Sequence, residues 1–143
     1  LSVPPPANDY YAVSLTAGDH ATLALKALTA GTLNLSLQNA AGTTLATASA
    51  GPTNVDKVLS NFVAATTGTY YVLITGTGGT SYDLVVTRNA AFDTEDNGSL
   101  AAAQSLGGVF AALGSVASGG AADDDYYGFT LAGRNSLNVT PVC

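Results

Sequence analysis

One stretch of this chain occurs twice, and the internal repeat constrains the fold more than any other feature. Residues 9–18 read DYYAVSLTAG, and residues 125–133 read DYYGFTLAG. In both copies an acid and two tyrosines lead into alternating apolar and polar residues and then a glycine. The alternation resumes after each glycine, at 23–25 and at 137–139. Such repeats are typical of tandem modules, so we expect one nearly whole β module and the beginning of a second.

Composition excludes several classes of function. The 143 residues suffice for one sizeable core. The net charge is −6 with four Lys and Arg residues, whereas nucleic acids and anionic membranes require clustered cations. The apolar runs are too short to cross a bilayer. The sparse charge and the abundance of Gly, Ala, Ser and Thr indicate a secreted or cell-surface bacterial protein. Without an initiator Met, we expect a mature or excised segment.

Hydrophobic periodicity predicts an all-β chain. Apolar residues alternate with polar ones in short segments separated by turns, which favours an antiparallel β-sandwich or jelly roll. Leu33, Leu35 and Leu37 give the clearest alternation. The predicted strands cover residues 9–15, 23–25, 33–37, 43–48, 58–63, 69–75, 81–87 and 109–116.

The pattern also predicts three local features. The strand at 69–75 is apolar on both faces, so we expect it at the centre of a sheet. One short helix is predicted near 99–105, with Ser99 or Asn97 as its N-cap. In the strand at 81–87, the core face is expected to carry Tyr82, Leu84 and Val86.

The chain is expected to divide into three parts. Residues 1–7 contain three consecutive prolines and are predicted to be an extended linker. Residues 8–88 form the nearly complete sandwich, and residues 89–143 form a linker followed by the N-terminal part of a second repeat. The single cysteine, Cys143, has no partner within the chain for a disulfide bond.

Several segments together resemble a known family. The repeated DYY strand is followed by LNLSLQNAAGT at 33–43, ATTGTYYV at 65–72 and GTSYDL at 79–84. In this order and spacing they resemble the bacterial pre-peptidase C-terminal domain, a family related to the collagen-binding modules of clostridial collagenases. The resemblance implies a non-catalytic β-sandwich.

The order of segments departs from the family pattern. The second copy has the segment that normally precedes the sandwich, whereas the first copy lacks it. Either residues 92–140 fold back to complete the first module, or a neighbouring chain completes it, since an exposed strand edge invites such pairing.

Acidic residues precede the predicted short helix and the second repeat, and they suggest a calcium site. Ca²⁺ prefers six to eight oxygen ligands from flexible loops. Asp93, Glu95 and Asn97 have the spacing that the resemblance implies for calcium ligands, and Asp123 and Asp125 are the ligands expected from the second loop. In the calcium-binding collagen modules a further acid follows the asparagine, and this chain has Gly98 at that position. The alternative is a solvated acidic loop with a capping residue.

Tyrosines and asparagines suggest further surface sites. In each tyrosine pair the alternation turns Tyr11 and Tyr127 inward, so Tyr10 and Tyr126 remain as candidates for contact with collagen or polysaccharide. The alternative is that these rings are half-buried parts of the strands. Three N-x-Ser/Thr triplets occur, and in a chain rich in Ser and Thr chance explains most of them. They lie at Asn34, Asn97 and Asn138.

Catalysis has little support in the sequence. His20 is the only histidine and follows a turn, so we expect it to be exposed. No nucleophile elbow, HExxH motif or phosphate loop occurs. The favoured interpretation is a non-catalytic accessory module of an extracellular hydrolase or surface protein, used for secretion, stability or substrate attachment. The alternative is a repeat of a cell-surface adhesin, or a filament subunit that associates with copies of itself by strand exchange.

Overall fold

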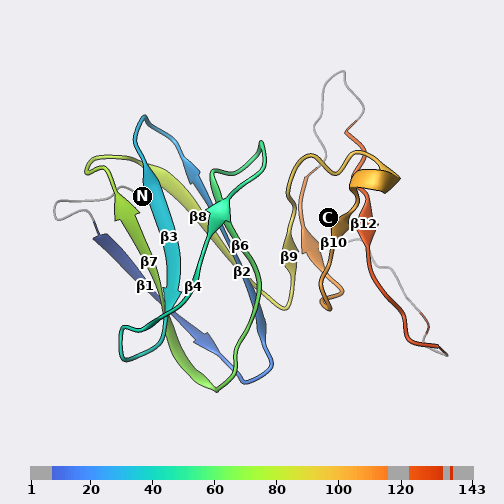
Figure 1. Cartoon of the computed structure of the whole chain (residues 1–143), viewed down its shortest axis with the longest axis horizontal. Coiled ribbons are helices and arrows are strands. Elements are labelled where there is room, and N and C mark those ends of the chain that lie inside the picture. Colours follow the sequence, from blue (N-terminus) through green and yellow to red (C-terminus); the bar gives the residue numbers. More distant parts are fainter. Residues whose placement is uncertain (1–7, 116–122, 134–135, 137–143) are drawn as a thin grey trace.

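The computed structural model describes residues 8–115, 123–133 and 136. These residues form a β-sandwich and a smaller C-terminal part that lies beside it (Figure 1). The predicted linker at 1–7, Cys143 and Asn138 lie outside the described residues. The all-β prediction is confirmed, and a single turn of 3-10 helix accompanies the strands.

Two four-stranded antiparallel sheets make up the sandwich. The order in the first sheet is β1-β7-β3-β4 and in the second β5-β6-β2-β8, so the predicted central position of β7 is confirmed. The strands of the first sheet are β1 (Asn8–Leu15), β3 (Leu33–Gln38), β4 (Thr44–Thr47) and β7 (Gly68–Gly76). Those of the second are β2 (His20–Ala27), β5 (Ser49–Ala50), β6 (Lys57–Val63) and β8 (Tyr82–Arg88).

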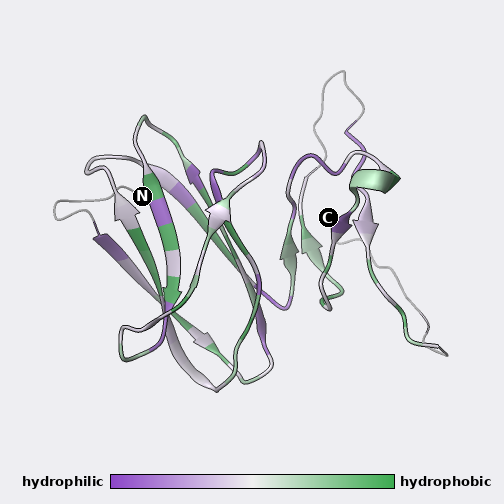
Figure 2. Cartoon of the chain, viewed as in Figure 1, coloured by the Kyte–Doolittle hydropathy of each residue, from purple (hydrophilic) through white to green (hydrophobic). Residues whose placement is uncertain are grey.

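The core lies between the two sheets and follows the alternation of the sequence. On β3 the three leucines are buried while Asn34 between them is exposed. Apolar residues consequently form bands along the strands in Figure 2. Burial of this surface is the main favourable term for folding. The core consists of Leu15, Ala21, Leu23, Leu25, Leu33, Leu35, Leu37, Leu59, Ala64, Tyr70, Val72, Ile74 and Tyr82.

A buried tyrosine joins the two sheets where β1 and β8 are edge strands. The Tyr82 side chain is fully buried, and its hydroxyl donates to Asp9 and lies 2.6 Å from the Tyr11 hydroxyl. Burial and these two partners raise the pKa of Tyr82 above its ordinary value. The first residues of the repeat therefore serve to close one side of the sandwich.

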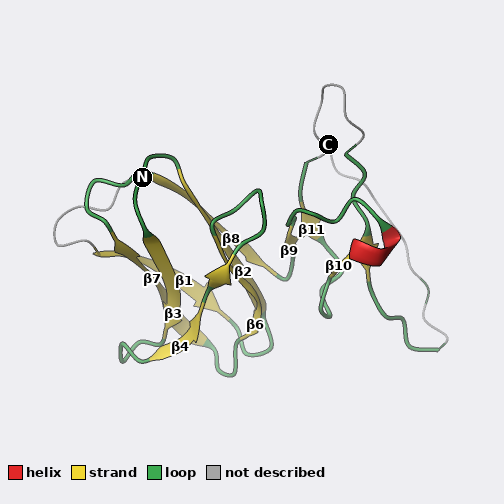
Figure 3. Cartoon of the chain, turned by 45° about the horizontal axis from the view of Figure 1, so that its top comes forward, coloured by secondary structure: helices red, strands yellow, loops and turns green. Residues whose placement is uncertain are grey.

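The C-terminal part is built from very short strands. Two parallel pairs, β11-β9 and β10-β12, form separate two-stranded sheets (Figure 3). Their small core contains Ala91, Leu106 and Val109, against which Tyr127 packs. The elements are β9 (Ala91–Phe92), the 3-10 helix η1 (Leu100–Ala102), β10 (Gln104–Ser105), β11 (Ala112–Leu113) and β12 (Tyr127–Gly128).

The C-terminal part packs against the outer face of the second sheet. Phe92 packs against a cluster that contains Ala24, Val55 and Val58. A hydrogen bond of 2.6 Å from Asn61 Nδ2 to the Gly107 carbonyl joins the two parts a second time. Within the described residues, this part adds no strand to either sheet of the sandwich.

Three local predictions differ from the structure. The helix predicted near 99–105 is only the 3-10 turn η1, capped by the Ser99 hydroxyl, because residues 104–105 pair with β12 instead. Of the strand predicted at 109–116, the described residues 109–115 form only β11. Val86, expected on the core face, is 37% exposed because β8 has no neighbour on its outer side.

His20 was predicted to be exposed and is half-buried instead. Its Nδ1 atom lies 2.5 Å from Asn61 Oδ1, and Asn61 adopts a left-handed backbone with φ of 56°. No helix in the described part of the chain has the length and apolar character that crossing a membrane requires.

Candidate functional site

Pairing between two short strands brings the two acidic loops together. Residues 93–97 follow β9, and residues 123–125 precede β12. The Tyr126 amide donates to the Asn97 carbonyl over 3.2 Å, and the Gln104 amide donates to the Tyr126 carbonyl over 2.9 Å. Acids that are about 30 positions apart in the sequence therefore meet at one end of the C-terminal part.

The Gln104 side chain fixes the first loop. Its Oε1 atom accepts a hydrogen bond of 2.9 Å from the Thr94 amide, and its Nε2 atom donates to the Phe92 carbonyl over 2.8 Å. One side chain thus bonds to the backbone on both sides of Asp93. This arrangement orients the Asp93 carboxylate toward the second loop.

Three carboxylates converge at this point. The oxygen atoms of Asp93, Glu95 and Asp125 lie within 4.8 Å of one another. Asp93 is buried, and its Oδ1 accepts hydrogen bonds from Tyr127 over 2.8 Å and from the Asn97 amide over 2.9 Å. Three acids in one place attract a cation.

Two buried oxygen atoms at the same place have no hydrogen-bond partner among the residues that the structure describes. They are Asn97 Oδ1 and Asp125 Oδ1. The Asn97 side chain is 1% exposed, and an unpaired oxygen in such a position costs on the order of 1–3 kcal/mol. Carboxylate and amide oxygens together are the ligands that Ca²⁺ prefers. The residues present therefore fit a calcium ion.

The electrostatics of the cluster also favour a cation. Burial, together with the charges of Asp123 and Asp93, raises the pKa of Glu95 above its ordinary value. Burial and the charges of Asp93 and Asp123 likewise raise the pKa of Asp125. Both shifts mean that the folded protein opposes ionisation at this site. A bound divalent cation would relieve that opposition.

Most of the predicted metal ligands are brought together. Asp93, Glu95, Asn97 and Asp125 meet at the cluster, whereas Asp123 is not one of the three converging carboxylates and contributes through its charge. In the alternative interpretation a residue of the acidic loop caps the short helix. In the structure Ser99, and not Asn97, caps η1. Because Asn97 is buried, its triplet cannot carry a glycan in this structure.

The two tyrosines predicted to contact a polymer do not form one surface. Both point outward as predicted, with Tyr10 57% exposed and Tyr126 40% exposed. Tyr10 lies on β1 of the sandwich and Tyr126 immediately before β12, and these strands lie at opposite ends of the molecule in Figure 1.

The sequence did not reveal three residues that shape the site. Tyr127 was recognised as inward-facing but not as a donor to Asp93. A Cβ atom at Gly114 would lie 2.6 Å from the Asp93 Cβ, so only glycine fits there. Asn54, in a loop of the sandwich, bonds to the backbone of the first acidic loop. An asparagine between a threonine and a valine carries no pattern that predicts such a role.

Comparison with known families identifies the sandwich. Residues 7–76, which extend to the end of β7, match the model of the bacterial pre-peptidase C-terminal domain. The sandwich belongs to the bacterial pre-peptidase C-terminal family. A comparison with curated proteins found no match.

The family assignment supports part of the predicted role. Pre-peptidase C-terminal domains occur in secreted proteins and are commonly non-catalytic accessory modules of secreted proteases. The match ends before β8 and does not include the acidic cluster. The interpretation of residues 89–143 as the beginning of a second pre-peptidase C-terminal repeat thus stays a prediction.

Proposed function

We propose that this chain is a non-catalytic accessory segment of an extracellular protein, and that Ca²⁺ fixes its C-terminal part against the sandwich. The main support is the convergence of Asp93, Glu95 and Asp125 beside the buried, unpaired Asn97 Oδ1. The family of the sandwich supports the non-catalytic role. Calcium is abundant outside cells, where a site of modest affinity is still occupied.

The location of the cluster explains what calcium would accomplish. Its candidate ligands come from two loops of a part whose core, within the described residues, contains three buried apolar side chains. A core of this size contributes little stability. An ion that binds the folded form stabilises it in proportion to the logarithm of the ion concentration. Calcium would therefore keep the C-terminal part folded.

Calorimetry tests this proposal. We expect isothermal titration of the EDTA-treated chain with CaCl₂ to show one site, and the melting temperature to rise with calcium concentration. Glu95→Gln should abolish both effects, whereas Asp83→Asn, on β8 of the sandwich, should leave both unchanged. The absence of calcium binding by the wild-type chain at millimolar concentrations would reject the site.

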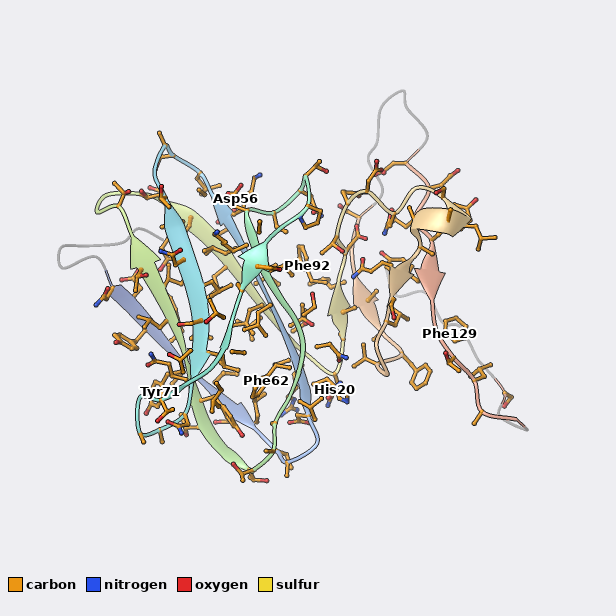
Figure 4. All side chains as sticks on the ribbon, in the orientation of Figure 1. His20, Asp56, Phe62, Tyr71, Phe92 and Phe129 are labelled. Carbon is orange, nitrogen blue, oxygen red and sulfur yellow. The ribbon has the colours of Figure 1, made fainter. Side chains whose placement is uncertain are left out.

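A second candidate function is assembly by strand exchange, which one observation favours. Residues 125–131 repeat residues 9–15, and in β1 the inward Leu15 is 2% exposed. The equivalent Leu131 is 40% exposed and Phe129 is 43% exposed. Phe129 points away from the sandwich in Figure 4. We infer that this strand could take the place of β1 on β7 of another copy.

A disulfide cross-link tests strand exchange. Ser14 lies opposite Thr69 in the β1–β7 register, and Thr130 is the equivalent of Ser14 in the repeat. In a Cys143→Ser background, Thr69→Cys with Thr130→Cys should yield disulfide-linked oligomers if strands exchange. The control pair, Ser14→Cys with Thr69→Cys, should form a disulfide within one chain. Monomers alone for the first pair, with the control oxidised, would rule out exchange.

A further inference from the structure

We infer that Asn54 is a positioning residue that couples calcium affinity to the contact between the sandwich and the C-terminal part. This inference rests on the proposed calcium site and adds a residue from outside the acidic loops. Asn54 lies in the loop between β5 and β6 of the sandwich. It is half-buried and faces the first acidic loop.

The nitrogen and the oxygen of the Asn54 side chain both form hydrogen bonds with the backbone that carries two of the proposed calcium ligands. Its Nδ2 atom donates to the Asp93 carbonyl over 2.9 Å, and its Oδ1 atom accepts from the Glu95 amide over 3.1 Å. The two bonds thus straddle Thr94 and fix the spacing between two residues whose carboxylates converge. Ligands held in advance need less ordering when the ion binds, which increases affinity.

The loop that carries Asn54 is itself rigidly attached to the sandwich. Val55 is buried in the cluster against which Phe92 packs, and the Asp56 amide donates to the Leu25 carbonyl over 2.9 Å. The Asp56 carboxylate in turn accepts a hydrogen bond of 2.6 Å from the Ala27 amide. In Figure 4 Phe92 lies between the two parts, and Asp56 lies on the sandwich. The position of Asn54 is therefore set by the second sheet and not by the acidic loops.

Coupling of this kind acts in both directions. If docking of the loop against Asn54 raises calcium affinity by some factor, calcium must strengthen that docking by the same factor. The sandwich loop at 51–56 should consequently become more ordered when calcium binds, although none of its residues is among the converging carboxylates.

Asn61 supplies a matched control. Its side chain also joins the sandwich to the C-terminal part, through the bond to the Gly107 carbonyl. That bond lies at the turn after β10 and does not involve the acidic loops. Asn61 has a φ of 56°, a conformation that glycine adopts without strain, so Asn61→Gly removes the contact and keeps the backbone. It should weaken docking of the two parts without moving Asp93 or Glu95.

Calcium titration of the whole chain tests the coupling. We expect Asn54→Ala to raise the calcium dissociation constant about tenfold, as expected from the loss of two modest hydrogen bonds. Asn54→Ser, which is too short to keep both bonds, should give a similar loss and serves if the alanine variant does not fold. Asn61→Gly should lower the melting temperature and leave the dissociation constant within about twofold of wild type.

Hydrogen exchange provides the second readout. Calcium should slow amide exchange at residues 51–56 in the wild-type chain and in Asn61→Gly, but not in Asn54→Ala. Unchanged affinity in both Asn54 variants, with wild-type binding intact, would overturn the coupling and leave the calcium site standing. A wild-type chain that binds no calcium would overturn both, so the two failures are distinguishable.

Discussion

Replacing Asp125 by asparagine should have opposite effects on the stability of the chain with and without calcium. The substitution keeps the shape of the side chain and removes one of three carboxylates whose oxygens lie within 4.8 Å of one another. Two unit charges at that distance repel by about 3.5 kcal/mol at an effective dielectric constant of about 20, and by about 1 kcal/mol in bulk water. The cluster is partly exposed, so screening brings the expected gain in the free energy of unfolding without calcium to about 1–2 kcal/mol.

With calcium the order should reverse. An ion present at about 100 times its dissociation constant stabilises the folded wild type by about 2.7 kcal/mol, and the variant should lose this increment. For a chain of this length, about 1 kcal/mol corresponds to roughly 3 °C in melting temperature. In EGTA we therefore expect Asp125→Asn to melt about 3–6 °C above wild type, and in saturating calcium to melt below it.

Differential scanning calorimetry of three proteins checks this prediction. Asp124→Asn is the control, because it changes the net charge equally at the adjacent, exposed position. It should shift the melting temperature little and keep the response to calcium. If both variants behave alike, or if calcium raises all three melting temperatures equally, the cluster is an ordinary solvated acidic loop.

Three further predictions concern the site and its surroundings. Gly114→Ala should displace Asp93, because the new methyl group would overlap its side chain. We expect a loss of about 1–3 kcal/mol in the free energy of unfolding, measured by scanning calorimetry, and calcium binding about tenfold weaker, measured by titration. Gly98→Asp supplies the further acid that the calcium-binding collagen modules have, and its Cβ atom would make only ordinary contacts. The extra carboxylate should raise the calcium affinity measured by titration about tenfold. A hydrogen bond from the Thr16 amide and a smaller contribution from the Asn89 side-chain amide lower the pKa of Asp19. The contribution of Asp19 to stability is therefore present above about pH 4 and is lost as the pH falls further. In urea unfolding, the stability difference between wild type and Asp19→Asn should shrink below about pH 4.

Periodicity predicted the sandwich well because burial leaves a direct trace in the sequence. Leu33, Leu35 and Leu37 alternate with polar residues, and all three are buried. Periodicity assigns a side chain to a face but does not say which strands are neighbours. Val86 was therefore assigned to the core face, whereas in the structure it is exposed on the edge strand β8.

The acidic cluster was partly predictable for a different reason. Asp93, Glu95 and Asn97 are close in sequence, and the resemblance to the family suggested that Asp125 would join them. Asn54 was not predictable, because its role depends on how the two parts pack and not on any neighbouring residue. The same holds for His20, whose burial follows from contact with another strand.

The C-terminal part has a small core and packs against a larger one, and this has a consequence for its resistance to proteases. Proteases cleave segments that open transiently, and the free energy of opening a region rises with the number of its buried contacts. The C-terminal part, with its two-residue strands, should open long before the sandwich does. Cleavage between the two parts would then be fast where calcium is scarce and slow where it is plentiful. The concentration of an ion in the surroundings would decide how long the segment stays attached.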